Sequence, residues 1–135
     1  MNQEHPDIAA LLRAGKTIAV VGLSNRRDRP SYGVAAYLQN AGYRIIPVNP
    51  LEQEILGEKA YSTLEEIPEA VDIVDVFRRP EFVPEIVESA IRMGAKAIWL
   101  QEGVIHEAAG KRAREAGLTV VMDRCILKEH RRLLA

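Results

Sequence analysis

The stretch TIAVVGLSNRRDRPSYGVAAYL, residues 17–38, decides the fold. It begins with a short apolar run that ends at Gly22, which is typical of a parallel strand covered on both faces. It ends with Val34, Tyr37 and Leu38 at helical spacing, and three arginines lie in the loop between strand and helix. A strand, a loop and a helix in this order form the first unit of an α/β fold, and the start of such a helix is suited to binding phosphate.

The same alternation continues to the end of the chain. The expected strands are residues 17–22, 43–50, 71–77, 96–101 and 118–123, and the expected helices are residues 8–14, 32–41, 79–93, 106–116 and 126–134, with a short helix at 63–67. This pattern predicts one α/β domain over residues 1–135, a Rossmann-like doubly wound five-stranded parallel sheet in the order 3-2-1-4-5. Pro47 fits its strand poorly, because proline removes a ladder donor.

The composition excludes several classes of protein. A net charge of -1 argues against a nucleic-acid binder that relies on bulk positive charge. One cysteine, Cys125, forms no internal disulfide and offers no zinc cluster. The first 15 residues lack an apolar core for export, and no window approaches the ~20 apolar residues of a membrane span, so we expect a cytoplasmic protein with no membrane partner.

Polar residues follow each expected strand. In an open α/β sheet, ligands bind beyond the carboxyl ends of the strands, beside the first one. The residues that should meet there are Gly22, Leu23, Ser24 and Asn25 with the arginine loop, then Asn49 and Pro50, then Phe77, Arg78, Arg79 and Pro80, then Gln101, Glu102 and Gly103, and finally Asp123, Arg124 and Cys125. These clusters are rich in amides, guanidiniums and hydroxyls and poor in general bases.

The loop after the first strand carries the sharpest signal. Gly22 lets the backbone turn close to a ligand, and the helix that begins near Tyr32 and Gly33 presents free N–H groups to an anion. Three arginines, Arg26, Arg27 and Arg29, can add charge-assisted bonds to phosphates. The alternative is that this charge run is only a solvated surface turn.

Two common nucleotide sites do not match this loop. The G-x-G-x-x-G fingerprint is absent, because Ser24 and Arg27 occupy the second and third glycine positions. The second strand ends in Asn49 and Pro50 instead of the acidic residue that binds the ribose of NAD, although the arginines could suit NADP. The Walker A pattern is also absent.

Five segments together carry a resemblance to a known family. They are VVGLSNRRDRPSYGVAAYL, GYRIIPVNP, VDIVDVFRRPEFVPEIV, AIWLQEGV and VVMDRCILKEHRRL. Their order and spacing resemble the small stand-alone CoA-binding proteins of bacteria and archaea, which are similar to the CoA-binding domain of the succinyl-CoA synthetase alpha subunit. The resemblance implies a Rossmann-like fold with coenzyme A at the carboxyl rim, and it implies no known reaction. The synthetase's phosphorylatable histidine lies in a second domain, which the single domain expected here does not include.

The resemblance also assigns roles by position. The turn at residues 22–25 would hold the CoA phosphates, Asn49 and Pro50 would lie near the nucleotide, Phe77 and Arg78 would line the pantetheine path, and residues 101–103 would close it. The prediction is a protein that binds coenzyme A or an acyl-CoA, with no catalytic machinery evident. An NADP-dependent reductase, a CoA-linked acyl-transfer enzyme and a regulatory protein that presents CoA to an unknown protein partner remain as alternatives.

Single residues add little chemistry. We assign no catalytic residue and no metal ligand, since His5, His106 and His130 are scattered and suit capping or surface positions. Trp99 is expected in the core, and Asp75 is expected to bond to backbone or to an arginine. Cys125 should lie at the ligand rim, where CoA could shield it, or else pack as a small apolar residue under the last helix.

Overall fold

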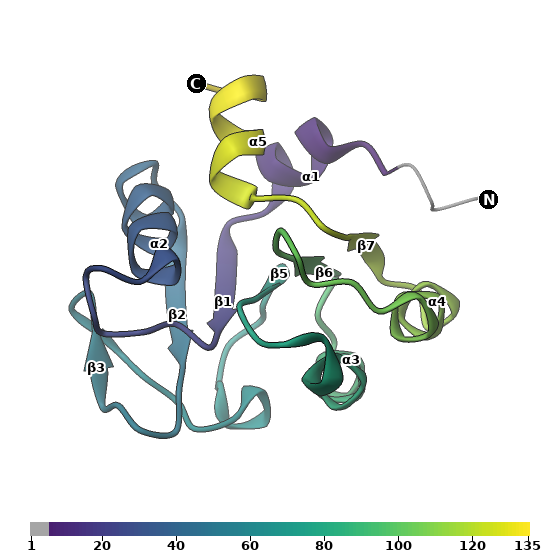
Figure 1. Cartoon of the computed structure of the whole chain (residues 1–135), viewed down its shortest axis with the longest axis horizontal. Helices are drawn as coiled ribbons and strands as arrows, with labels where there is room; N and C mark the ends of the chain where they lie inside the picture. The colour runs from purple at the N-terminus through teal and green to yellow at the C-terminus, as the bar shows by residue number, and fades with distance from the viewer. Residues whose placement is uncertain (1–5) are drawn as a thin grey trace.

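A computed structural model describes residues 6–135 and shows a five-stranded parallel sheet with helices on both faces (Figure 1). The strands of the sheet are β1 (Thr17–Val21), β2 (Arg44–Val48), β5 (Ile73–Val76), β6 (Ala97–Leu100) and β7 (Thr119–Val121). The helices are α1 (Ile8–Ala14), α2 (Pro30–Asn40), α3 (Val83–Met93), α4 (Glu107–Glu115) and α5 (Ile126–Leu133). The predicted Rossmann-like α/β class is confirmed.

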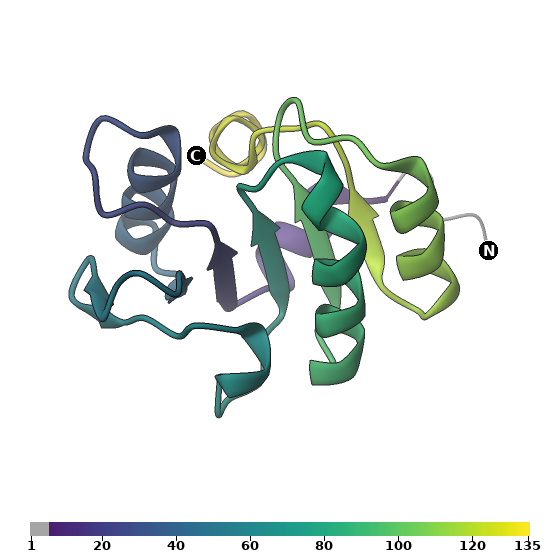
Figure 2. The same cartoon turned by 60° about the horizontal axis from the view of Figure 1, so that its bottom comes forward.

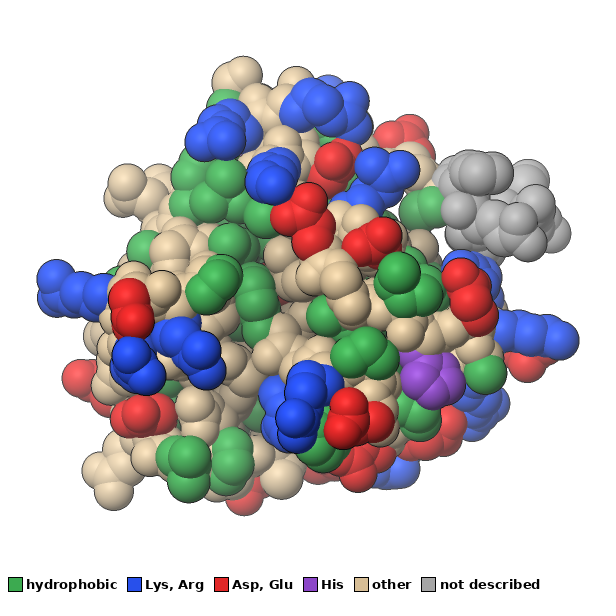
Figure 3. Space-filling model, viewed as in Figure 1, with side chains coloured by type: hydrophobic (Ala, Val, Ile, Leu, Met, Phe, Trp, Pro, Cys, Tyr) green, Lys and Arg blue, Asp and Glu red, His purple; other side chains and the backbone are tan. Residues whose placement is uncertain are grey.

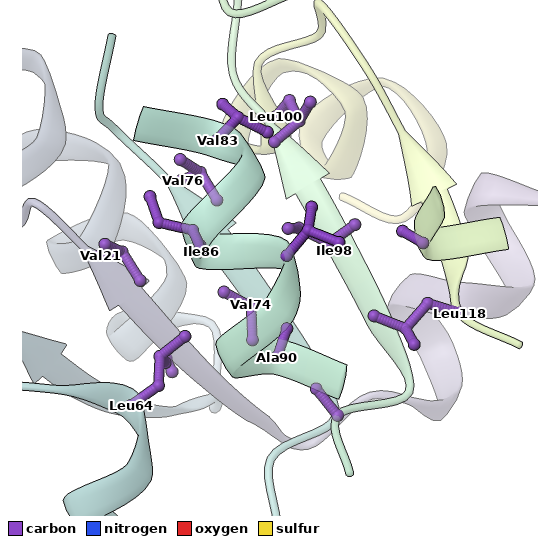
Figure 4. Packing of buried hydrophobic residues seen from close by; sticks show 14 of the residues in the cluster. Val21, Leu64, Val74, Val76, Val83, Ile86, Ala90, Ile98, Leu100 and Leu118 are labelled. Carbon is purple, nitrogen blue, oxygen red and sulfur yellow. The ribbon is translucent and has the colours of Figure 1, made fainter. Parts of the chain in front are cut away.

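The two faces of the sheet form two separate hydrophobic layers, because side chains alternate along each strand. Helices α3 and α4 cover one face, where Ile86 and Ala90 pack over Val74 and Ile98 (Figure 4). Helices α1, α2 and α5 cover the other face, where Trp99 is fully buried, as predicted. Figure 2 shows the strands pointing in one direction, so that the loops after them gather at a single edge.

The strand order differs from the prediction. The sheet runs β2-β1-β5-β6-β7, which is 2-1-3-4-5 in the order of the five expected strands and not 3-2-1-4-5. The third strand lies against β1, with Ile18 opposite Ile73, so that β2 stands at the edge. Pro47 explains the difference, because a proline with no N–H is tolerated on an edge strand and not in the middle of a sheet. Its carbonyl faces outward and accepts a hydrogen bond from the Tyr61 N–H at 3.0 Å.

The connection from β2 to β5 contains no α-helix in the part of the chain that the structure describes. It consists of a small antiparallel hairpin, β3 (Glu54–Ile55) and β4 (Glu58–Lys59), and a 3₁₀ turn, η1 (Leu64–Glu66). The short helix expected at residues 63–67 is this turn, which Thr63 and Glu66 close with a reciprocal capping box. A second 3₁₀ turn, η2 (Pro80–Phe82), leads from β5 into α3.

Candidate ligand-binding site

The loops that follow β1, β2, β5, β6 and β7 meet at the carboxyl edge of the sheet, which Figure 1 views obliquely. After β1 the chain first forms β2 on one side and then β5 on the other, so the point where the strand order reverses lies between β1 and β5. In the view of Figure 3, charged side chains of both signs are spread over this side of the molecule, with hydrophobic side chains between them.

Gly22 is required by the fold itself. Its φ of +86° is a left-handed conformation that side chains disfavour, and a Cβ built on it would lie 2.5 Å from the Phe77 carbonyl oxygen. The ends of β1 and β5 therefore approach each other too closely for any other residue. This close approach also fixes Phe77 beside the turn, at the point where the strand order reverses.

The arginine loop, residues 25–29, projects from a firmly held base. The Ser24 N–H donates to Oγ of the buried Ser31 at 3.0 Å, and the Arg26 N–H donates to Oγ of Ser24 at 3.1 Å. Arg26 pairs with Asp28 at 3.0 Å, while Arg27 and Arg29 are exposed. Arg29 is the residue that caps the N-terminus of α2, but its side chain makes no capping bond. The loop thus presents cations directly before the first turn of an 11-residue helix.

The two asparagines of the predicted site tie loops together. Asn49 donates from Nδ2 to the Leu23 carbonyl at 2.9 Å and accepts from the Leu51 N–H at 2.8 Å. Asn25 donates to Oε1 of Glu52 at 3.3 Å. Both side chains therefore hold the loop after β2 against the loop after β1. Pro50, the neighbour of Asn49, is exposed on the same rim.

A cleft of about 500 Å³ opens beside the arginine loop, between α2 and α5. It is lined by Pro30 and Val34 of α2, residues 77–80 after β5, residues 101–104 after β6, and Cys125 before α5. Eight residues that the sequence placed at this rim line it: Phe77, Arg78, Arg79, Pro80, Gln101, Glu102, Gly103 and Cys125. The predicted residues of the turn and of the arginine loop lie outside its wall, as do Tyr32, Gly33, Asn49 and Pro50.

The structure adds cleft residues that the sequence reasoning missed. Pro30 and Val34 belong to the first turns of α2, where the sequence predicted only apolar residues at helical spacing. Val104 extends the predicted cluster of residues 101–103 by one residue. Pro30 and Val104 each directly follow a predicted residue, Arg29 and Gly103.

A larger hollow, of about 690 Å³, lies beside β7 and α4, at the side of the sheet away from β2. Its lining comes from residues 120–124, from the first residue of α1 and Pro6 before it, and from α4 with the loop before it. No residue after β1 or β5 reaches it within the described chain, so it lies away from the point where the strand order reverses. The smaller cleft is therefore the candidate site.

Hydrogen bonds and ion pairs hold the far wall of the cleft. The Gln101 Oε1 accepts from the Ile126 N–H at 3.2 Å, and Glu102 pairs with Lys128 of α5 at 3.1 Å. The Gly103 N–H donates to Oδ1 of Asp123 at 2.7 Å. The loop after β6 is thus tied to the loop after β7 and to α5. Cys125, at the N-terminus of α5, is half-buried and lines the cleft, so its predicted place at the rim is confirmed.

Asp75 corrects one expectation. It is fully buried in β5, on the same face of the sheet as Phe77, with Val20 and Trp99 beside it in register. Within residues 6–135, neither carboxyl oxygen has a hydrogen-bond partner, so the expected bond to backbone or arginine does not form. Removal from water raises the pKa of Asp75 well above its ordinary value, because an apolar layer disfavours the charged carboxylate.

The histidines take structural positions. His106 caps α4, as predicted, because its ring nitrogen accepts from the Ala109 N–H at 3.1 Å. His130 contacts the Tyr37 hydroxyl at 2.8 Å, and His5 lies outside the described residues. Across residues 6–135, no three His, Cys, Asp or Glu side chains gather into a group that could hold a metal ion. Nor does any helix in this range combine the length and apolar character that crossing a membrane requires.

The fold and the position of the cleft define a Rossmann-like α/β domain with its cleft at the carboxyl edge. Within that class, residues 16–131 match the family model described as CoA binding domain, and the chain belongs to this family. The predicted resemblance to CoA-binding proteins is confirmed. The family gives no support to the NADP-dependent reductase.

The chain matches curated proteins over different shares of their length. It is 46% identical over 129 residues to the uncharacterized protein YneT of Bacillus subtilis, and this match covers 96% of each chain. It is 30% identical over 120 residues to the alpha subunit of acetate–CoA ligase (ADP-forming) II of Pyrococcus furiosus. That match covers 81% of this chain and 26% of the subunit, so the chain corresponds to about a quarter of the ligase subunit.

Solved structures show the same architecture. A hypothetical protein from Pyrococcus horikoshii superposes with a TM-score of 0.93 at 41% identity, covering 100% of this chain and 94% of that one. A protein from Thermus thermophilus superposes with a TM-score of 0.91 at 40% identity, covering 99% of this chain and 100% of that one. These likenesses support the observed strand order.

Proposed function

We propose that residues 1–135 act as one domain that binds coenzyme A, or an acyl-CoA, at the carboxyl edge of the sheet. The arginine loop receives the phosphates, and the cleft receives the pantetheine arm. The observation that carries this proposal is the position of the cleft: it begins at Pro30, directly after Arg29, beside the point where the strand order reverses. Membership of the CoA binding domain family supports the same ligand.

The chemistry of the two parts suits the two parts of the ligand. Guanidinium groups form forked, charge-assisted hydrogen bonds with phosphates, and the exposed arginines are placed where such bonds need no rearrangement of the fold. The cleft combines apolar side chains, Val34 and Phe77, with the polar loop after β6, which suits an arm that alternates methylene and amide groups.

Calorimetry with CoA, NADP and NAD tests the proposal. CoA should bind, and NAD should not, since the turn after β1 lacks the glycines of a dinucleotide site and β2 ends without an acidic residue. Salt should weaken CoA binding, because phosphate contacts near the surface are screened. Tight binding of NAD together with no binding of CoA would reject the proposal.

A triple variant isolates the arginine loop. Replacing Arg26, Arg27 and Arg29 by alanine should weaken CoA binding, with about 1.5–3 kcal/mol for each bond to a charged group as the ceiling. The matched control replaces three exposed cations away from this edge, Arg13, Lys16 and Lys111, and should leave the affinity unchanged. Equal affinity in wild type and in the loop variant would show that the loop is a solvated turn.

A further inference from the structure

In the side-chain amide of Gln101, the oxygen accepts a hydrogen bond and the nitrogen donates none among the described residues. Oε1 accepts from the backbone N–H of Ile126, the first residue of α5, at 3.2 Å. Because a backbone N–H can only donate, this bond fixes which end of the amide is the oxygen and leaves the Nε2 hydrogens pointing elsewhere. No hydrogen bond among residues 6–135 uses Nε2, and the residue as a whole is 5% exposed, so Nε2 is left to the little solvent that reaches it.

The unused amide group belongs to the cleft. Gln101 lines the cleft, and its backbone is already satisfied, since its N–H donates to the Val76 carbonyl and its carbonyl accepts from the Val104 N–H. The apolar side chains of Val104 and Phe77 lie in the same lining. An N–H group that loses its contact with water when a ligand enters needs an acceptor from that ligand, and a ligand that brings one gains affinity and specificity.

The distance from the arginine loop indicates which part of the ligand meets Gln101. The loop follows β1 and Gln101 follows β6, with β5 between them, so the two lie two strand spacings apart, or roughly 10 Å. With phosphates on the arginine loop, an arm that crosses β5 brings its sulfur end to the β6 side, where Gln101 and Cys125 line the cleft.

We infer that the cleft selects the thioester of a short-chain acyl-CoA over free coenzyme A, with Nε2 of Gln101 donating a hydrogen bond to the acyl carbonyl oxygen. The inference rests on the proposed binding of CoA. A thioester supplies a carbonyl acceptor at the end of the arm, whereas a free thiol supplies only a weak one. The acyl chain is short because the cleft, at about 500 Å³, must also hold the arm.

Two ligands that differ only at the carbonyl test the inference. Acetyl-CoA carries the carbonyl, and S-ethyl-CoA has a methylene in its place. By calorimetry, acetyl-CoA should bind about fivefold tighter, which corresponds to roughly 1 kcal/mol for one neutral hydrogen bond. Equal affinities for the two ligands would overturn the inference. If neither these ligands nor CoA bound, the proposed function would fail, and the inference with it.

The variant Gln101→Glu separates recognition from folding. Glutamate keeps an oxygen for the Ile126 N–H and suits a helix N-terminus, but it has no N–H to donate. It should retain the melting temperature and lose the fivefold preference, and the uncharged Gln101→Leu should lose the preference as well. Gln53→Glu makes the same chemical change on an exposed glutamine outside the cleft and should keep the preference. An equal loss of affinity for both ligands in Gln101→Glu would show that the amide binds another part of the arm, which overturns the inference.

Discussion

Replacing Asp75 by asparagine should remove a pH dependence from the stability of the fold. The carboxyl group is fully buried between Val20 and Trp99, and its burial raises its pKa well above the ordinary value. A carboxyl group whose pKa is higher in the folded state binds its proton more tightly there than in the unfolded chain. Stability is therefore greatest below the unfolded pKa, about 3.9, and falls as pH rises toward the folded pKa. Asparagine has nearly the same shape and does not titrate.

The size of the effect follows from one proton. The free energy of unfolding of the wild type should fall by up to about 1.4 kcal/mol per pH unit relative to the Asp75→Asn variant. The difference in stability therefore shifts toward the variant as pH rises above about 4.

Urea unfolding of both proteins at a series of pH values between 4.5 and 7 measures this difference. Other carboxyl groups act in the opposite direction: hydrogen bonds from Arg92 and Arg44 lower the pKa values of Glu65 and Glu69, and that stability is lost as pH falls. These contributions are the same in both proteins and cancel in the difference. Asp28→Asn changes an exposed aspartate and controls for the substitution itself. A difference that stays constant with pH would refute the reasoning, because it would mean that Asp75 is not a buried, unpartnered acid.

Three further changes probe the rim. Gly22→Ala should lower the free energy of unfolding by several kcal/mol, the scale of severe point mutations, because its Cβ would collide with the Phe77 carbonyl. The control is Gly42→Ala, which also has a positive φ, +103°, but has no described atom within 4 Å of the added Cβ. In the same urea titration, this control should lower the free energy of unfolding by only about 1 kcal/mol. Similar losses in both would argue against the close approach. Asn49→Ala removes two loop bonds and should destabilise the fold by about 1–3 kcal/mol, whereas an effect on CoA affinity with unchanged stability would assign Asn49 to the ligand. Alkylation of Cys125 should slow when CoA is added, and equal rates with and without CoA would place the bound arm elsewhere.

The sequence predicted the fold class and most of the rim, because both depend on local patterns. Apolar runs ending at Gly22 and Phe77 give parallel strands, and the residues after parallel strands necessarily share an edge. That rule alone brought Phe77, Gln101 and Cys125 to one cleft. The predicted strand order was wrong because strand order depends on where a long connection crosses the sheet, which local patterns do not encode. Pro47 is the residue in β2 that is compatible with an edge strand and not with a central one.

The sequence could not predict the hydrogen-bond partners of individual side chains. Ser24, Asn25 and Asn49 have the residue types of a ligand site, yet in the structure they mainly join loops to one another. A buried aspartate is expected to accept hydrogen bonds, yet no described group donates one to the carboxyl group of Asp75. Neither outcome is encoded in spacing, since each depends on which distant backbone atoms come within about 3 Å of the side chain.

Pro47 has a consequence for how the molecule behaves in a crowded solution. An exposed edge strand offers a template on which another chain can add a strand, and this is a common route to aggregation. On β2 the outward position at residue 47 has no N–H to offer, and its carbonyl is already taken by Tyr61. A second chain approaching this edge finds no continuous row of donors and acceptors to pair with. Pro47 therefore makes β2 a poor template for a further strand. The same residue that fits the interior of a sheet badly also disfavours aggregation through this edge.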